Sequence, residues 1–383
     1  MRIHYICEYN YPGEGRNVSF SPAGVSKMNY ITDVLSSYEY PVNVFSTSRT
    51  LEKGYFRKEK IVRGNRSFIY RSTFFAKGRL SKRLERWYAI CQLIKYLLFT
   101  VKKQDVVVAY HERYYQPWLS RISRLRGFTF IYEVEELYTV AANLPQKDVE
   151  KEKAGLGANA YIFSTRALNE IVNTENVPFV ISHGSYTLPV RYGERFDDDK
   201  IHVIYAGTFD KTKGGAGFAI SAAEYLSEKY HLHICGFGDD RETQFVKDLI
   251  AEVSQRSSCT ISFDGKKTGE EYLRFLQKCH IGLSTQNPDG EYNNTSFPSK
   301  ILAYLSNGLQ VVTVRIPVIE NSGAGRYIHY YDSTEPREIA RAICDVDLSK
   351  AVNGCEVVKG LDDAFRFELL QILNKVKEEK HAN

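Results

Sequence analysis

The stretch from Glu291 to Arg315, EYNNTSFPSKILAYLSNGLQVVTVR, constrains the fold more than any other part of the chain. It predicts a polar loop, a short helix and a buried strand. Thr295 and Ser296 are of the types that cap helices. An apolar stripe at helical spacing follows, and Asn307-Gly308 predicts a left-handed end to the helix. The β-branched run 311–314 is typical of a strand covered on both faces, as in a parallel sheet.

Lys300 stands in the first turn of this predicted helix. The positive end of the helix dipole disfavours a cation there by roughly a few tenths of a kcal/mol. A bound anion would reverse that penalty, because backbone N–H groups and the ammonium would converge on it. Ser296 and Ser299 would add hydroxyl donors. The segment therefore predicts a phosphate or diphosphate site; the alternative is a lysine that extends into solvent.

The run Ser-Phe-Pro-Ser-Lys-Ile-Leu-x-Tyr-Leu-x-x-Gly, followed by a valine-rich strand, resembles the donor-binding segment of GT-B glycosyltransferases of family 4. The resemblance implies that this loop and helix hold the diphosphate and sugar of a nucleotide-sugar donor. Two glutamates common in that family are replaced by Thr295 and Ala303, and Glu291 is the candidate for the first of these roles. The donor contacts implied in this segment are Glu291, Thr295, Ser296, Phe297, Ser299 and Lys300.

Length and composition are those of a globular, two-domain chain. At 383 residues the chain is long enough for two domains, each with its own core. Its seven cysteines show no metal-type spacing, and their odd number argues against a disulfide framework. No run reaches the roughly 18 apolar residues of a membrane span, and the N-terminus is not of the signal-peptide type. A cytoplasmic protein is expected.

The charge is distributed unevenly along the chain. Residues 1–190 carry 27 Lys and Arg against 17 Asp and Glu, whereas the remainder carries 24 against 29. Within the basic half, residues 79–103 predict an amphipathic helix. Leu80, Leu84 and Trp87 begin its apolar stripe, and basic residues fall largely on the other face. The helix either docks on an anionic membrane surface or packs its stripe against its own domain. No nucleic-acid partner is expected.

In the first half, strands that end in glycine or polar residues predict an α/β sheet. The first strand leads to a loop and to a helix that begins near Gly24, which matches the small-residue turn found near the donor phosphate in GT-B enzymes. A later strand ends at His111, a residue that is structural or catalytic. Another ends in Glu133, Glu135 and Glu136, where family-4 enzymes often have a His-Asp pair. Glu135 is the candidate for orienting or deprotonating an acceptor hydroxyl; a surface acidic cluster is the alternative.

The second half repeats the strand–loop pattern. Its first strand ends in Gly-Thr-Phe-Asp-Lys-Thr-Lys-Gly, which resembles the donor motif Gly-Arg-Leu-x-x-x-Lys-Gly of the family. Thr208 replaces the arginine, and a lysine in the loop restores the positive charge that a departing diphosphate needs. The next two strands end in further glycines. The donor-site residues expected in this region are Gly207, Thr208, Lys211, Lys213, Gly236 and Gly265.

Together these features predict an α/β protein of the GT-B type, with two doubly wound Rossmann-like domains and an interdomain cleft. The expected bounds are 1–192, 200–360, and a C-terminal helix over 361–383 that crosses back to the first domain. The resemblance implies a retaining, metal-independent transferase without a cofactor. It would move a sugar from a nucleoside-diphosphate donor, with a UDP-sugar expected, to a glycan or lipid-linked acceptor in cell-surface polysaccharide biosynthesis. A non-catalytic GT-B subunit and a sugar-nucleotide epimerase are the alternatives. Attachment to the inner face of the cell membrane is a further expectation.

Overall fold

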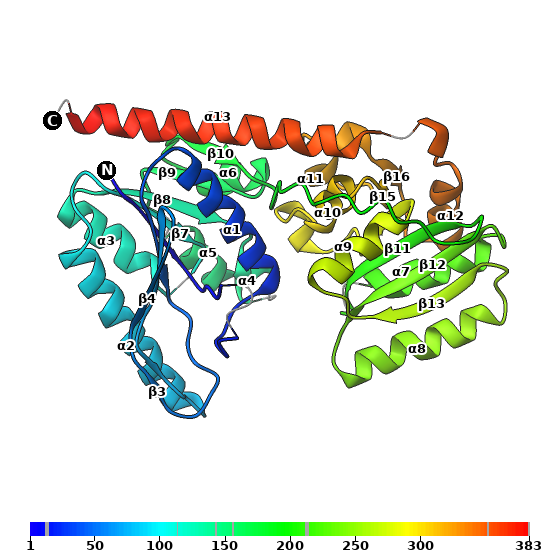
Figure 1. Cartoon of the computed structure of the whole chain (residues 1–383), viewed down its shortest axis with the longest axis horizontal. Helices are drawn as coiled ribbons and strands as arrows, with labels where there is room; N and C mark the ends of the chain where they lie inside the picture. The colour runs from blue at the N-terminus through cyan, green and yellow to red at the C-terminus, as the bar shows by residue number, and fades with distance from the viewer. Residues whose placement is uncertain are drawn as a thin grey trace. The chain divides into compact units, whose positions relative to one another are not determined.

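The chain folds into two α/β units, shown in Figure 1. The computed structural model describes residues 1–11, 15–112, 114–141, 144–154, 157–210, 214–350 and 352–381. Unit 1 consists of Met1–Ser185 and Ala364–Asn383, and unit 2 of Tyr186–Asp363. Each unit contains a largely parallel sheet. The expectation of two Rossmann-like domains is confirmed.

The sheet of unit 1 has eight strands in the order β10-β9-β8-β7-β1-β2-β5-β4. All neighbours pair in parallel except β4 and β5. Because successive strands are added first on one side of β1 and then on the other, the order reverses between β1 and β7. The strands are β1 Ile3–Cys7, β2 Val42–Ser46, β4 Glu59–Arg63, β5 Arg66–Tyr70, β7 Val106–Tyr110, β8 Thr129–Val134, β9 Ala160–Phe163 and β10 Phe179–Ile181; a separate hairpin joins β3 Tyr55–Phe56 and β6 Thr73–Phe74.

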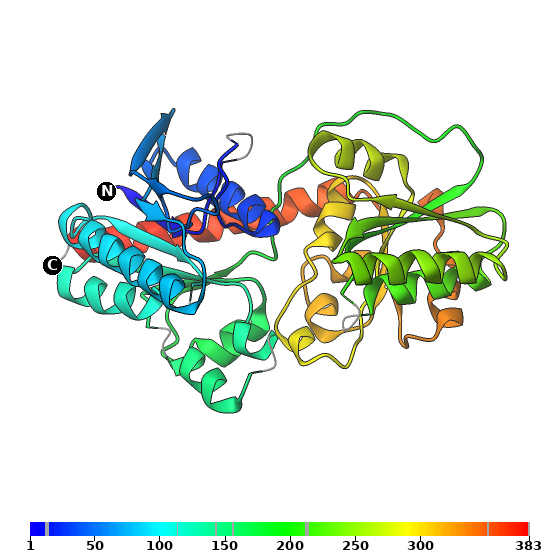
Figure 2. The same ribbon diagram turned by 90° about the horizontal axis from the view of Figure 1, so that it is seen from below.

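Helices cover both faces of this sheet (Figure 2). They are α1 Pro22–Ser37, α2 Arg79–Phe99, α3 Gln116–Arg126, α4 Tyr138–Ala141, α5 Gln146–Ala154, α6 Arg166–Val172 and the later part of α13 Gly354–His381. One apolar face of α13 is buried, including Phe365 and Leu369. Phe365 contacts Tyr30 of α1 with ring centres 5.7 Å apart. The C-terminal helix therefore completes the core of unit 1.

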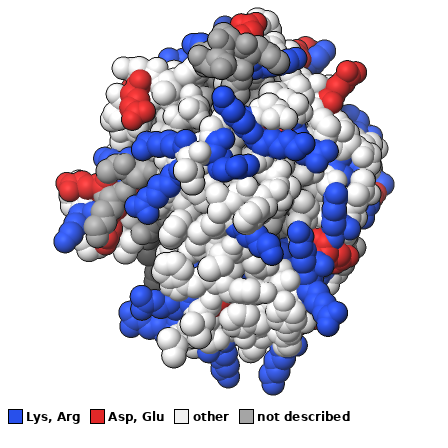
Figure 3. Space-filling view, turned by 90° about the vertical axis from the view of Figure 1, so that its left-hand side faces the viewer, with Lys and Arg blue, Asp and Glu red and all other residues white. Residues whose placement is uncertain are grey.

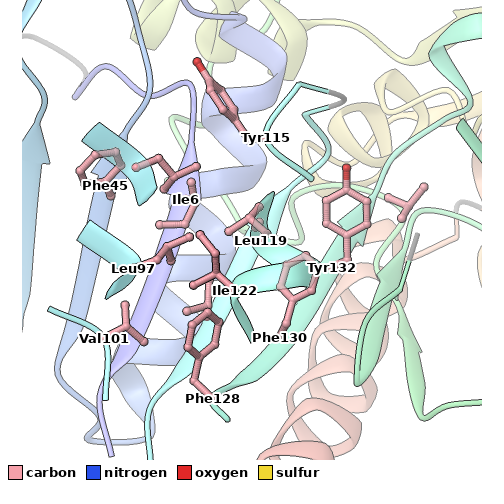
Figure 4. Close-up of a cluster of buried hydrophobic side chains, with 14 of the residues drawn as sticks. Ile6, Phe45, Leu97, Val101, Tyr115, Leu119, Ile122, Phe128, Phe130 and Tyr132 are labelled. Atoms are coloured by element: carbon pink, nitrogen blue, oxygen red, sulfur yellow. The ribbon is translucent and has the colours of Figure 1, made fainter. Parts of the chain in front are cut away.

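The main core of unit 1 lies between the sheet and helices α2, α3 and α6 (Figure 4). Side chains that alternate along the strands point into it, among them Ile6, Phe130 and Tyr132. Their strand neighbours face the other side of the sheet because side chains alternate across a strand. Leu97 of α2 and Leu119 of α3 close the core. Burial on both faces explains why these strands are apolar throughout.

The first half of the stripe predicted for α2 does not pack against unit 1. Leu80, Leu84 and Trp87 are 72%, 57% and 50% exposed. Instead, Glu85 faces inward, where it accepts hydrogen bonds from Arg71 (2.6 Å) and the Thr73 hydroxyl (2.8 Å). This buried pair sets the rotation of the helix and turns the three apolar residues outward. Further along, the buried side of the helix is formed by Ala89, Ile90, Leu93, Tyr96 and Leu97.

Unit 2 contains a six-stranded sheet in the order β13-β12-β11-β14-β15-β16, parallel throughout. Its order reverses between β11 and β14. The strands are β11 Ile201–Thr208, β12 Tyr230–Phe237, β13 Thr260–Gly265, β14 Ile281–Ser284, β15 Gln310–Val314 and β16 His329–Tyr331. The helices are α7 Gly215–Ala222, α8 Asp240–Ser254, α9 Gly269–Lys278, α10 Lys300–Ser306, α11 Pro317–Glu320 and α12 Pro336–Cys344, with short 3₁₀ turns η1 Ala223–Tyr225, η2 Glu291–Asn294, η3 Gly325–Tyr327 and η4 Leu348–Lys350.

The segment that opened the sequence argument folds largely as predicted. The helix α10 begins at Lys300, and β15 is buried throughout. Gly308 has φ +85°, a conformation that favours glycine and ends the helix. The predicted capping residues are wrong: the residue before the helix is Ser299, whose side chain makes no capping bond. Residues 291–294 form the separate turn η2, and residues 296–298 continue the loop between that turn and α10.

The segment predicted as the linker lies against unit 2. The backbone N–H of Tyr192 donates to Oε1 of Gln277 over 3.0 Å. Just before it, Arg191 donates to the carbonyl of Asn307 over 2.6 Å. The segment from Tyr186 onward accordingly belongs to unit 2. None of the helices in the described part of the chain is long and apolar enough to cross a membrane.

Candidate functional site

The reversal point of the unit 2 sheet lies between the carboxyl ends of β11 and β14, the position where open α/β sheets bind ligands. There the hydroxyl of Thr285 donates to the carbonyl of Gly215 over 2.6 Å. A Cβ atom on Gly215 would lie 2.5 Å from the hydroxyl of Tyr205 and 3.0 Å from the Thr285 carbonyl. Any larger residue at position 215 would clash with these groups. Glycine therefore lets the start of α7 lie close to both strand ends.

Lys300 reaches this same point from α10. Its ammonium nitrogen lies 4.3 Å from the ring centre of Tyr205, a cation–π contact. It also lies 3.0 Å from where a Cβ on Gly207 would be. The Tyr205 hydroxyl donates to the carbonyl of Thr208 over 3.1 Å, and burial raises the pKa of this tyrosine. The structure thus brings together three of the predicted donor residues, Gly207, Thr208 and Lys300.

Two further predicted glycines lie on β12 and β13. Gly236 pairs in register with Gly207, and a Cβ on Gly236 would lie 2.0 Å from the Gly207 carbonyl oxygen. Only glycine permits this approach of the two strand ends. Gly265 ends β13 and pairs with Cys235, one strand further from the reversal point. Lys211 and Lys213 fall outside the residues that the structure describes.

The loop before α10 is fixed by Asn293. Its amide donates to the carbonyls of Asn287 (2.6 Å) and Pro288 (3.1 Å), and its side-chain oxygen accepts from Gln286 (2.9 Å). A single buried side chain therefore ties the η2 turn to the start of the loop. The predicted donor residues in this loop differ in exposure: Thr295 and Phe297 are buried, Ser296 is half-buried, and Glu291 and Ser299 are exposed.

A second polar cluster lies at the carboxyl ends of the unit 1 strands. Lys27, from α1, is only 4% exposed. Its ammonium group donates to the carboxylate of Glu135, which follows β8, and over 2.8 Å to the carbonyl of Ser182, which follows β10. The Ser164 hydroxyl in turn donates to the Glu135 carbonyl. Glu135 is therefore held at both its side chain and its backbone.

Glu133 lies beneath this ion pair, fully buried. Its Oε1 is 3.7 Å from the Lys27 nitrogen and has no hydrogen-bond partner among the residues that the structure describes. Its Oε2 accepts from the Tyr5 hydroxyl over 2.5 Å. Burial, partly offset by Lys27 and reinforced by Glu135, raises the pKa of Glu133 to about 8. The cluster therefore contains the ion pair of Lys27 with Glu135 and, beside it, the carboxyl group of Glu133, which holds a proton near neutral pH.

His111 occupies a separate pocket of unit 1. It is 2% exposed and stacks on Tyr138, with ring centres 4.6 Å apart. Its Nε2 lies 3.3 Å from Oε1 of Glu152. Burial opposes ionisation of Glu152, but the contacts with His111 and Thr139 outweigh it and lower the pKa of Glu152 to about 2. His111 is thus a tightly packed side chain beside a carboxylate. Neither of its ring nitrogens has a hydrogen-bond partner among the described residues.

Gly24 lies in the first turn of α1, after the N-cap Ser21, whose hydroxyl accepts from the Gly24 N–H over 3.3 Å. A Cβ there would lie 3.4 Å from the hydroxyl of Tyr110, an ordinary contact. Burial and then the charge of Glu135 raise the pKa of Tyr110. Gly24 therefore belongs to the helix and lies close to the Lys27 cluster.

Sequence reasoning missed Lys27, Tyr5 and Tyr205. A signal for Lys27 was present, because it shares a helical face with Ile31 and Val34, which are fully buried. A charged residue on such a stripe needs a buried partner. The two tyrosines carried no comparable signal, since each reads as an ordinary apolar position in a buried strand.

Comparison with solved structures finds close agreement in fold. The chain matches an α,α-trehalose 6-phosphate synthase from Burkholderia multivorans with a TM-score of 0.71 and 11% identity, over 100% of this chain and 98% of that one. A trehalose-6-phosphate protein from E. coli bound with UDP-2-fluoro glucose matches with a TM-score of 0.66 and 10% identity, over 98% and 99%. A UDP-forming synthase from Burkholderia xenovorans in complex with glucose-6-phosphate gives 0.65 and 12%, over 97% and 100%.

No protein-family model matches the chain, and no curated protein matches it in sequence. At 10–12% identity the structural likeness shows the fold alone. That fold is GT-B, as the sequence predicted.

Proposed function

We propose that the chain is a glycosyltransferase that moves a sugar from a nucleoside-diphosphate donor, most simply a UDP-sugar, to a hydroxyl of an acceptor. The observation that carries the proposal is the convergence of Lys300, Gly207 and Gly215 at the reversal point of the unit 2 sheet. Glycines let backbone approach a diphosphate, and an ammonium group neutralises its charge. The synthases of the same fold, whose structures contain UDP-2-fluoro glucose or glucose-6-phosphate, support a nucleotide-sugar donor and a sugar acceptor.

In this proposal the Lys27 cluster serves the acceptor. Glu135 is 17% exposed at its side chain and so has access to solvent, whereas Glu133 has none. Glu135 orients the attacking hydroxyl or receives its proton, and Lys27 keeps the carboxylate in place. Lys27 is therefore a positioning residue, because its ammonium lies under Glu135 and is itself buried.

Cationic side chains take the place of a metal at the leaving diphosphate. Lys300 supplies one charge, and the sequence motif adds Lys211 and Lys213. Charge builds on the leaving oxygen in the transition state, where fixed cations stabilise it most. The reaction proposed is accordingly metal-independent, with retention of the anomeric configuration as in the family that the sequence resembles.

The acceptor is proposed to be a glycan or a lipid-linked sugar used in cell-surface polysaccharide biosynthesis. The exposed half of α2 supports a membrane-confined acceptor. Arg79, Lys82, Arg83 and Arg86 surround a hollow of about 400 Å³ on this helix. On the same half of the helix Leu80, Leu84 and Trp87 are exposed.

Exposed apolar residues next to cations suit the interface of an anionic bilayer, since the apolar groups enter it and the cations pair with phosphates. Figure 3 shows Lys and Arg side chains spread over this face of unit 1, with acidic ones mainly towards its edges. Cytoplasmic residence with reversible attachment to the inner face of the membrane follows from the proposal.

The test of the proposed function is a thermal-shift screen of nucleotide-sugars, followed by an assay for release of the nucleoside diphosphate. One UDP-sugar should raise the melting temperature, since saturation at a hundredfold excess over Kd adds about 2.7 kcal/mol. That donor should then be hydrolysed slowly by the purified chain and faster with an acceptor. Binding without any turnover would instead indicate a non-catalytic subunit. Conversion of the donor with no diphosphate released would indicate an epimerase.

A further inference from the structure

Histidine side chains gather at the amino-terminal ends of β11 and β12, on the edge of the unit 2 sheet away from Gly207. His202 pairs in register with His231, and His233 follows on the same face of β12. One nitrogen from each of these three rings lies within 4.8 Å of those of the other two. His202 and His233 are almost fully buried. This cluster has no part in the sugar chemistry proposed above, because six residues of β11, about 20 Å, separate His202 from Thr208.

The outer nitrogens of the three rings are already bonded. Nε2 of His202 lies 2.7 Å from a carboxylate oxygen of Asp198. Nδ1 of His233 lies 3.1 Å from Asp264, and Nε2 of His231 lies 3.0 Å from the hydroxyl of Ser262. A carboxylate only accepts, so the first two nitrogens carry protons.

The hydrogen bonds of Ser262 show where the proton of the third ring, His231, lies. Its hydroxyl donates to Asp264 over 2.9 Å and therefore accepts from His231. Each neutral ring has a single N–H, and in each ring it is used by one of these acceptors. The remaining nitrogens, among them Nδ1 of His202 and Nε2 of His233, then carry lone pairs.

Those two lone-pair nitrogens lie 2.9 Å apart. Such a contact between neutral rings is repulsive unless a cation lies between them, either a proton or a metal ion. Neutral imidazole is the form that binds metals.

We propose that His202, His231 and His233 form a binding site for a divalent transition metal ion of the zinc type. Imidazole nitrogens suit Zn²⁺, Cu²⁺ and Ni²⁺. Nitrogen–zinc bonds of about 2.0–2.1 Å in a tetrahedral site place the ligand nitrogens roughly 3.3 Å apart. The observed separations, from 2.9 Å to at most 4.8 Å, bracket that value. The rings of His231 and His233 stack with centres 4.0 Å apart, so His231 has to rotate out of this stack for the three nitrogens to converge on one ion.

The surroundings fit such a site. Histidine ligands usually donate their other N–H to a carboxylate or similar acceptor, as Asp198, Asp264 and Ser262 provide. A cavity of about 270 Å³ opens beside His202 and Asp198 and gives room for a water molecule as the fourth ligand. Lys200 also lines this cavity, but its ammonium donates to the hydroxyl of Thr260 over 2.6 Å.

His280 lies beside the three histidines but is not one of the proposed ligands. Its Nδ1 accepts the backbone N–H of His202 over 3.0 Å, so it has no lone pair to offer there. It stacks beside His202 with ring centres 5.8 Å apart, yet it lies outside the three-residue group. The site would tie β11 and β12 to the segment that carries Asp198, which makes it a structural site.

The test is a titration of the EDTA-treated full chain with ZnCl₂, followed by calorimetry, with CoCl₂ as a spectroscopic probe. One equivalent of Zn²⁺ should bind and raise the melting temperature, and Co²⁺ should give the visible absorption of a tetrahedral site. His231→Ala, at the least buried of the three ligands, should lower the affinity at least tenfold. His329→Ala, a histidine of β16 outside the group, should not.

Two results would overturn the proposal. Wild-type protein that binds neither metal above the buffer blank would leave a shared proton as the cation. Equal binding by wild type and His231→Ala would place the metal elsewhere. Circular dichroism in EDTA controls for misfolding, and the Co²⁺ spectrum of wild type decides the question even if a variant fails to fold.

Discussion

The ammonium nitrogen of Lys27 lies 3.7 Å from Oε1 of Glu133, a carboxyl group with no exposure to solvent. The same nitrogen bonds Glu135, so one buried cation serves two carboxyl groups. One positive charge cannot neutralise two carboxylates in a buried site, and the deeper one therefore keeps its proton. Charge balance at this point links the stability of unit 1 to pH.

The first prediction follows from Glu133. Its pKa is raised to about 8 in the folded chain, above its unfolded value of about 4.3. The stability that it contributes is therefore complete below pH 4.3, decreases as pH rises, and is lost above about 8. Glu133→Gln cannot ionise, so between pH 5 and 8 the wild type should lose up to about 1.4 kcal/mol per pH unit relative to it. Urea unfolding at four pH values measures this difference. Parallel curves for the two proteins would contradict it.

The second prediction concerns Lys27. Lys27→Met keeps the length of the side chain but leaves Glu135 without its cation and the Ser182 carbonyl without a donor. Breaking a buried ion pair by removing one partner typically costs about 3–5 kcal/mol. We expect a loss of about 3 kcal/mol at pH 7, measured by urea unfolding. Lys229→Met, at an exposed lysine of unit 2, should stay within about 0.5 kcal/mol of wild type. Similar losses in both variants would argue against the pair.

The third prediction concerns Glu135 as the acceptor-side group. Glu135→Gln removes the charge but keeps an oxygen for Lys27 to bond, so the fold should be retained. We expect kcat to fall at least about tenfold while the Kd for the donor changes less than about twofold. Steady-state kinetics and calorimetry measure the two quantities. With kcat at the wild-type value, Glu135 would be a structural residue, and His111→Ala would be the next variant to assay.

The fourth prediction concerns Lys300. Lys300→Ala should weaken UDP binding and reduce turnover by at least about tenfold, equivalent to about 1.4 kcal/mol. Stability should change little, since the lysine is only half-buried. Exposed Lys229, which directly precedes β12 at the amino-terminal edge of the same sheet, gives the control Lys229→Ala. If both variants bind UDP as wild type does, the donor site is not at the reversal point of unit 2.

The fifth prediction concerns the exposed half of α2. Each basic residue near an anionic surface contributes about 1 kcal/mol, so wild type should sediment with anionic vesicles at low salt. The combined change Lys82/Arg83/Arg86→Glu should abolish this binding. Neutral vesicles are the control, and 1 M salt should release wild type because the Debye length falls from about 10 Å at 0.1 M to about 3 Å. If wild type ignores anionic vesicles, a soluble glycan becomes the preferred acceptor.

The sequence by itself determined the two sheets and the helix that begins at Lys300. Runs such as Val106–Tyr110 are apolar throughout because both faces of a parallel strand are covered, and this pattern is local. The end of α10 at Gly308 was also predictable from the sequence, because a positive φ is a property of a single residue. Local signals also placed Gly207 and Thr208 at a strand end, the part of a sheet where ligands bind.

Tertiary structure alone decided which polar groups meet. Lys27 and Glu135 are 108 residues apart, and only the strand order brings α1 over the end of β8. The outward turn of Leu80 and Trp87 likewise depends on Glu85 pairing with Arg71, an interaction that helical periodicity does not contain. The sequence pattern shows how apolar each face of a helix is. Which face turns towards the sheet depends on the residues that the helix contacts in the folded chain.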